Sequence, residues 1–79
     1  MKATVKLTLN ETIEKTEGLT RNKIAVQGRI RPATISELCN GKSKSISFET
    51  LTKIIDALNE LTGNQYGMED VLTIEYETE

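Results

Sequence analysis

Two short helix-forming segments joined by a tight turn constrain the fold of this 79-residue chain more than any other feature. The first is predicted over residues 20–27, and Pro32 opens the second because proline suits the first turn of a helix. Gly41 ends the second segment, since glycine readily adopts the left-handed conformation that follows a helix. The small side chain of Ala25 lets the two helices approach closely, and Ile30 can fill the corner between them.

Helices are also expected on both sides of this pair. A capping box, in which the Thr8 hydroxyl accepts a hydrogen bond from the Glu11 amide, begins a helix over residues 9–17. Ser47 is the expected N-cap of a longer helix, which ends at Gly63. This longer helix carries an apolar stripe at helical spacing, made of Phe48, Leu51, Ile54, Ile55 and Leu58.

Alternating side chains predict a short strand at each end of the chain. In residues 2–7 every second side chain is apolar, and in residues 73–78 Ile74 and Tyr76 alternate with glutamates. One further helical turn is expected over residues 68–72. The two strands can pair within one chain or between two chains. Pairing within the chain is favoured because both strands flank the same bundle.

The chain is long enough for one domain with a thin core. Only three aromatic residues are present, so leucine, isoleucine and valine must build that core. We therefore expect residues 1–79 to form a single domain of the all-α class. Its architecture is a compact bundle of four to five helices with short terminal strands.

Charge is distributed unevenly along the chain, although the net charge is only −2. Residues 21–44 contain six basic residues and one acidic residue, whereas residues 68–79 contain five acidic residues and no basic one. The basic segment can face a polyanion if the acidic segment points away from it. The basic residues are Arg21, Lys23, Arg29, Arg31, Lys42 and Lys44.

Several classes of function are not expected. The chain has no histidine, which is the commonest general base and a common metal ligand, so we expect neither an enzyme nor a metal or other cofactor. No apolar run approaches the roughly 20 residues of a membrane span. The single cysteine, Cys39, fits a reducing cytoplasm and is expected to pack at the edge of the core.

The central segments resemble the Cro/CI-type (XRE-family) helix-turn-helix, also called lambda repressor-like. The resemblance rests on Leu19-Thr20-Arg21-Asn22-Lys23-Ile24-Ala25, followed by Ile30-Arg31-Pro32-Ala33-Thr34-Ile35-Ser36-Glu37-Leu38-Cys39-Asn40-Gly41-Lys42, and extends over about residues 8–72. Two features depart from the family pattern. Arg29 stands where the family usually has glycine, so the turn is reshaped or Arg29 adopts a positive φ. Residues 60–67 also form a longer link than is usual.

The resemblance implies a DNA-binding transcriptional regulator that places its third helix in the major groove of double-stranded DNA. On that helix, the resemblance assigns base reading to Pro32, Ala33, Ser36 and Glu37. Contact with the DNA backbone falls to residues at the start of the second helix and around the ends of the third. These residues are Thr20, Arg21, Arg31, Asn40, Lys42, Ser43 and Lys44.

Alternatives remain at this stage. A repressor is expected, but the same family resemblance would also fit an antitoxin, which binds a toxin and its own promoter. A third reading is a protein-interaction adaptor without DNA binding, which would present an exposed apolar surface around Tyr66, Met68 and Tyr76. A homodimer is also open, since one monomer contributes few contacts and two recognition helices roughly 34 Å apart would match one DNA turn.

Overall fold

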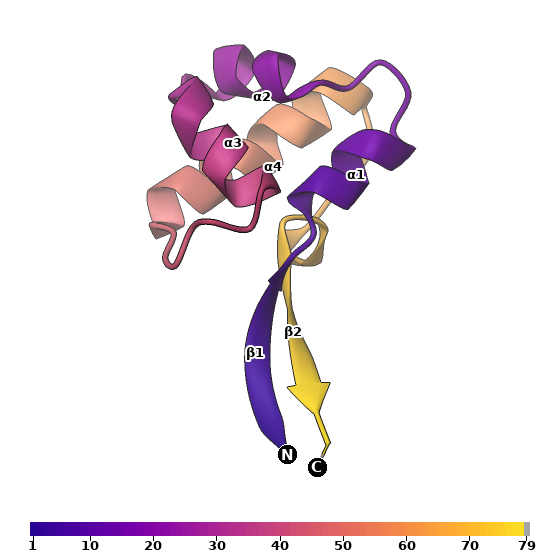
Figure 1. Ribbon diagram of the computed structural model, residues 1–79. Coiled ribbons are helices and arrows are strands. Elements are labelled where there is room, and N and C mark those ends of the chain that lie inside the picture. The colour runs from indigo at the N-terminus through magenta and orange to yellow at the C-terminus, as the bar shows by residue number, and fades with distance from the viewer. Residues whose placement is uncertain (79) are drawn as a thin grey trace.

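A two-stranded ribbon projects from a bundle of four helices in the computed structural model, which describes residues 1–78 (Figure 1). Glu79, counted above in the acidic segment, lies outside the described residues. The predicted fold class is therefore confirmed. The elements in chain order are β1 (Lys2–Leu7), α1 (Leu9–Lys15), α2 (Arg21–Gly28), α3 (Pro32–Cys39), α4 (Phe48–Thr62), the 3₁₀ turn η1 (Met68–Asp70) and β2 (Leu72–Glu77).

The two strands pair with each other within the chain, as favoured from the sequence. They run antiparallel, and Val5 lies opposite Ile74 in the register. Because residues directly opposite each other project to the same face, the ribbon has one apolar and one polar face. The apolar face carries Ala3, Val5, Leu7, Leu72, Ile74 and Tyr76.

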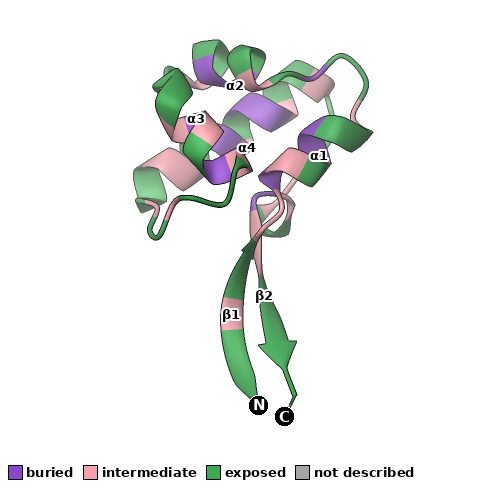
Figure 2. Ribbon diagram, viewed as in Figure 1, coloured by how far each residue is buried: buried purple, intermediate pink, exposed green. Residues whose placement is uncertain are grey.

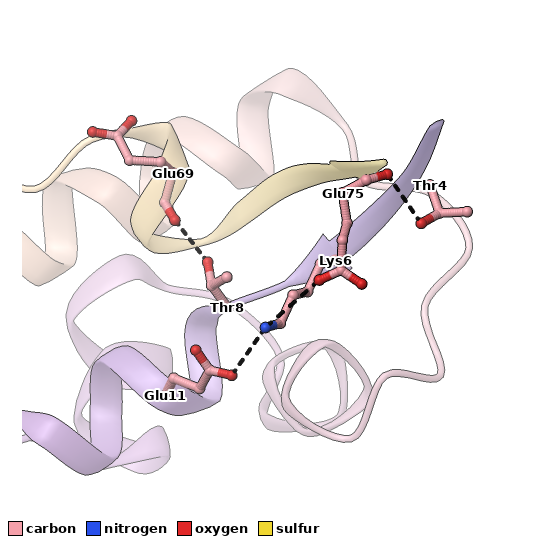
Figure 3. A network of polar contacts seen from close by, with 6 residues as sticks. All are labelled: Thr4, Lys6, Thr8, Glu11, Glu69 and Glu75. Carbon is pink, nitrogen blue, oxygen red and sulfur yellow. Dashed lines mark hydrogen bonds and ion pairs between the residues drawn. The ribbon is translucent and has the colours of Figure 1, made fainter. Parts of the chain in front are cut away.

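The predicted capping box at the start of α1 is wrong. The Thr8 hydroxyl donates to the carbonyl oxygen of Glu69 at 2.7 Å and caps no amide of α1 (Figure 3). The Glu11 carboxylate lies 3.7 Å from the Lys6 ammonium instead of reaching back to Thr8. The return of the chain through η1 supplies this acceptor, and the Thr8 backbone (φ −109°, ψ 0°) lacks the extended conformation of a capping residue. Helix α1 also ends at Lys15, two residues earlier than predicted.

The core lies where all four helices and the C-terminal segment meet (Figure 2). Ile24, Ile35, Ile54 and Val71 are fully buried there, which joins α2, α3, α4 and the residue before β2. The complete buried apolar set is Leu9, Ile13, Leu19, Ile24, Ala25, Ile35, Leu38, Ile54, Ala57, Leu58 and Val71.

Phe48 does not belong to this core, which corrects the predicted apolar stripe of α4. Its side chain is 86% exposed, whereas Ile54 and Leu58 further along the same helix are fully buried. Phe48 is the first residue of α4, at the end of the helix that projects beyond the bundle (Figure 1). Leu51 and Ile55 are half-buried against the core. Among the described residues, no helix is long and apolar enough to span a bilayer.

Candidate DNA interface

The turn between α2 and α3 is reshaped around two residues with different tasks. Arg29 takes the left-handed conformation (φ 54°, ψ 47°), so it accepts the positive φ for which glycine is usual. The Ile30 amide then donates to the Ala25 carbonyl at 2.9 Å, which closes the helix end. Gly28 is needed for space, because a β-carbon there would lie 3.3 Å from the Lys53 carbonyl oxygen of α4. The turn therefore fixes α2 against α4 and sets the direction in which α3 leaves.

Helix α3 presents the four predicted base-reading residues away from the core. Pro32, Ala33 and Glu37 are exposed and Ser36 is half-buried. Ile35 and Leu38 anchor the opposite side of the helix and are buried. With Pro32 at its first position, α3 begins without using a side-chain cap. The exposed side therefore combines an apolar start with one hydroxyl and one carboxylate.

A guanidinium held between two asparagines links α2 to the end of α3. The Arg21 guanidinium donates to the Asn10 side-chain oxygen at 3.0 Å and to the Asn40 side-chain oxygen at 3.4 Å. The sequence predictions placed Arg21 and Asn40 on the DNA backbone separately, and the structure brings the two together. Asn10 was missed, because nothing in its neighbourhood along the chain indicates that α1 passes Arg21. A guanidinium has five N–H donors, so donors remain for a phosphate.

The loop after α3 carries the predicted lysines at the surface. Lys42 and Lys44 are exposed, and Ser43 is half-buried. Gly41 has a positive φ of 72°, and the Lys42 amide donates to the Glu37 carbonyl at 2.9 Å. This αL turn ends α3 and turns the chain into the loop.

A side-chain cap begins α2. The Thr20 side chain accepts from the Lys23 amide at 3.1 Å. This bond leaves the amides of Arg21 and Asn22 without partners inside the helix, at its positive dipole end. The Lys23 ammonium is engaged locally and donates to the Gly18 carbonyl at 2.7 Å.

The remaining candidates separate into exposed and packed side chains. Arg29 and Arg31 are exposed beside the N-terminal end of α3. Cys39 is half-buried against the core, as predicted. Burial raises the pKa of its thiol, and the charge of Arg21 opposes this rise. Among the described residues, no group of three or more histidine, cysteine, aspartate or glutamate side chains is arranged to hold a metal ion.

Two short helices joined at a tight turn, with the second anchored on one side and open to solvent on the other, define a helix-turn-helix protein. A family model described as helix-turn-helix matches residues 15–63, which is more than half of the chain. The chain therefore belongs to the Cro/CI-type (XRE) helix-turn-helix family, a family of DNA-binding regulators that are not typically enzymes. No curated protein and no solved structure matches the chain.

Proposed function

We propose that this chain, acting as one DNA-binding domain, is a sequence-specific transcriptional repressor that inserts α3 into the major groove. The observation that carries the proposal is the surface of α3, whose solvent side is flanked at both ends by exposed basic residues. Arg29 and Arg31 precede the helix, and Lys42 and Lys44 follow it. Basic groups at both ends suit the two phosphate strands that border a groove.

The two sets of residues have different tasks in this proposal. Pro32 and Ala33 contact a thymine methyl group, and Ser36 bonds to a base edge. Glu37 accepts a hydrogen bond from a cytosine amino group. Phosphates are bound by the residues around the helix ends, which fix the position of α3 without reading sequence. The backbone-contact set is Thr20, Arg21, Arg31, Asn40, Lys42, Ser43 and Lys44, to which the exposed Arg29 is added.

The distribution of acidic residues supports the same orientation. Glu75 and Glu77 lie on β2, in the ribbon that projects out of the bundle (Figure 1). Lys6 partly neutralises Glu75, since its ammonium lies 3.8 Å from the Glu75 carboxylate (Figure 3). A phosphate backbone at α3 therefore meets the basic loop rather than the acidic strand.

A fluorescence titration with random double-stranded DNA over a salt series tests the proposal. We expect binding at low salt that weakens linearly on a log–log plot, with a slope of roughly three to ten released counterions. Selection of preferred sites from a random library would follow, and repression would be measured on a promoter carrying such a site. Absence of binding at low salt would refute DNA recognition and favour a protein partner.

Substitutions separate positioning from reading. We expect Lys44→Ala to weaken binding to all DNA sequences and to lower the salt slope by about one. Glu37→Ala is expected to change the preferred base at one position, with a discrimination of about 1–3 kcal/mol lost there. The two residues lie on either side of the Asn40-Gly41 helix end and are both exposed, so they form a matched pair. Equal losses of affinity on every sequence would contradict these assignments.

A further inference from the structure

A cleft at the base of the ribbon has the dimensions of a small-molecule site. It has a volume of about 440 Å³ and lies between the ribbon and the segment that joins α3 to α4. Pockets for small molecules have volumes of about 300–1,000 Å³. Eleven residues line the cleft, whereas a standard protein interface engages about 20–30 residues on each side. The cleft therefore suits a small molecule rather than a folded partner.

The lining of the cleft separates into an apolar part and a polar part. The polar side chains all come from the single segment of residues 40–45. The apolar side chains come from the ribbon, from α3 and from the end of the loop that follows α3. They are Val5, Leu7, Leu72, Leu38, Cys39 and Ile46. A molecule that fills this cleft therefore needs an apolar body and one polar end.

The polar end of the cleft has a positive charge. Lys44 is the only charged residue among those that line it, and no aspartate or glutamate is present there. In the described part of the chain the ion pairs engage Lys6 and Lys53, so the Lys44 ammonium has no carboxylate partner. Asn40 adds amide N–H donors, because its side-chain oxygen already accepts from the Arg21 guanidinium at 3.4 Å. An ammonium beside N–H donors is complementary to an anionic oxygen group.

We infer that this cleft binds a small organic acid, with its apolar body between the ribbon and the bundle and its carboxylate at Lys44. The site itself is independent of DNA binding, and only its consequence rests on the proposed function. Ser43 and Lys44 line the cleft and also belong to the proposed DNA-backbone contacts. The carboxylate and a DNA phosphate therefore compete for the same ammonium group. Bound acid lowers the affinity for DNA, and DNA lowers the affinity for the acid by the same factor.

Titrations of the full chain followed by heteronuclear NMR test the site in the absence of DNA. Octanoate is the probe, and we expect it to bind with a Kd of about 1 mM, as is usual for so small a ligand. The amide signals of Val5, Ile46 and Leu72 should shift. Acetate should cause no such shifts at the same concentrations, because it lacks the apolar body. Octylammonium has the same apolar body but the opposite charge, so it should bind at least about threefold more weakly.

Two lysine variants locate the anionic group. Lys44→Gln should weaken octanoate binding about two- to fivefold, the contribution of one exposed ion pair. Lys42→Gln is the matched control, since Lys42 carries the same charge in the same loop but does not line the cleft. Both side chains are exposed, so neither substitution should disturb the fold, which circular dichroism checks.

Each result of these titrations decides the inference. Absence of shifts at about 10 mM octanoate, well above the expected Kd, would overturn the site. Shifts confined to residues outside the cleft, or equal shifts with acetate, would overturn it as well. Octylammonium binding as tight as that of octanoate, or equal losses in the two lysine variants, would overturn the assignment of the carboxylate to Lys44.

A DNA titration in the presence of octanoate tests the consequence. At an octanoate concentration equal to its own Kd, competition should raise the Kd for random double-stranded DNA about twofold. The same concentration of sodium acetate is the control for ionic strength, since added salt alone weakens DNA binding. An unchanged Kd for DNA would overturn the competition. If the native chain binds no DNA, the proposed function fails, while the NMR titrations still decide whether the cleft binds the acid.

Discussion

The α2–α3 turn gives the sharpest test of the structure, because two neighbouring residues should respond to substitution in opposite directions. A β-carbon on Gly28 would lie 2.8 Å from the Ile30 Cδ1 atom and 3.3 Å from the Lys53 carbonyl oxygen. The isoleucine methyl can move, but the carbonyl belongs to the backbone of α4 and cannot move alone. Over-packing of this kind costs about 1–3 kcal/mol. Helix propensity returns less than about 1 kcal/mol, since Gly28 is the last residue of α2. We therefore expect Gly28→Ala to lower the free energy of unfolding by about 1–2 kcal/mol.

Arg29→Gly should act in the other direction. The left-handed conformation of Arg29 costs an L-residue about 1–2 kcal/mol. Glycine removes that strain but gains about 0.5–1 kcal/mol of conformational freedom in the unfolded chain. The expected net result is a free energy of unfolding that rises by about 0.5–1 kcal/mol. Arg29→Ala is the matched control, because it removes the charge and retains the β-carbon, so it should bring no gain.

Urea denaturation followed by far-ultraviolet circular dichroism measures all three variants. For a domain of this size, 1 kcal/mol corresponds to about 4–8 °C in Tm, so thermal melts give a second readout. A Gly28→Ala variant as stable as the native chain would refute the close approach of the turn to α4. An Arg29→Ala variant stabilised as much as Arg29→Gly would show that charge, rather than backbone conformation, determines the effect.

Two further predictions concern Arg21 and Cys39. Asn10→Ala removes an acceptor of the Arg21 guanidinium, so we expect the free energy of unfolding to fall by about 0.5–1.5 kcal/mol. Urea denaturation measures this change. Asn22→Ala is the control, because Asn22 is exposed on α2 and its loss should have little effect. The half-buried Cys39 thiol, whose pKa is raised by burial, should react with iodoacetamide several-fold more slowly in the native chain than in urea. The unfolded chain loses its thiol proton at lower pH than the folded chain, so stability should fall as pH rises above the usual pKa of cysteine. Equal alkylation rates in the native chain and in urea would contradict this view of the thiol. So would a Cys39→Ser variant whose stability falls with rising alkaline pH as steeply as that of the native chain.

Local chemistry determined most of the helices from the sequence alone. Thr20 and Ser47 cap α2 and α4, Pro32 opens α3, and Gly63 ends α4 with a φ of 74°. These signals are reliable because each depends on backbone groups within a few residues of the side chain concerned. The apolar stripe of α4 likewise identified Ile54 and Leu58 as core. The helix-turn-helix could therefore be predicted before any contact was known.

Tertiary structure decided what depends on residues far apart in the chain. The Thr8 hydroxyl donates to a carbonyl 61 residues away instead of forming the predicted local cap. Phe48 has the helical spacing of the apolar stripe, but no neighbouring element covers its side chain. Arg21 is positioned by Asn10 on another helix, and Tyr66 is half-buried with its hydroxyl 2.9 Å from that of Thr16, so it does not join an exposed patch with Met68 and Tyr76. The sequence alone determined which segments form helices and strands, because those preferences are local. Only the packing of the chain determined which faces remain exposed to solvent, because burial depends on contacts between distant residues.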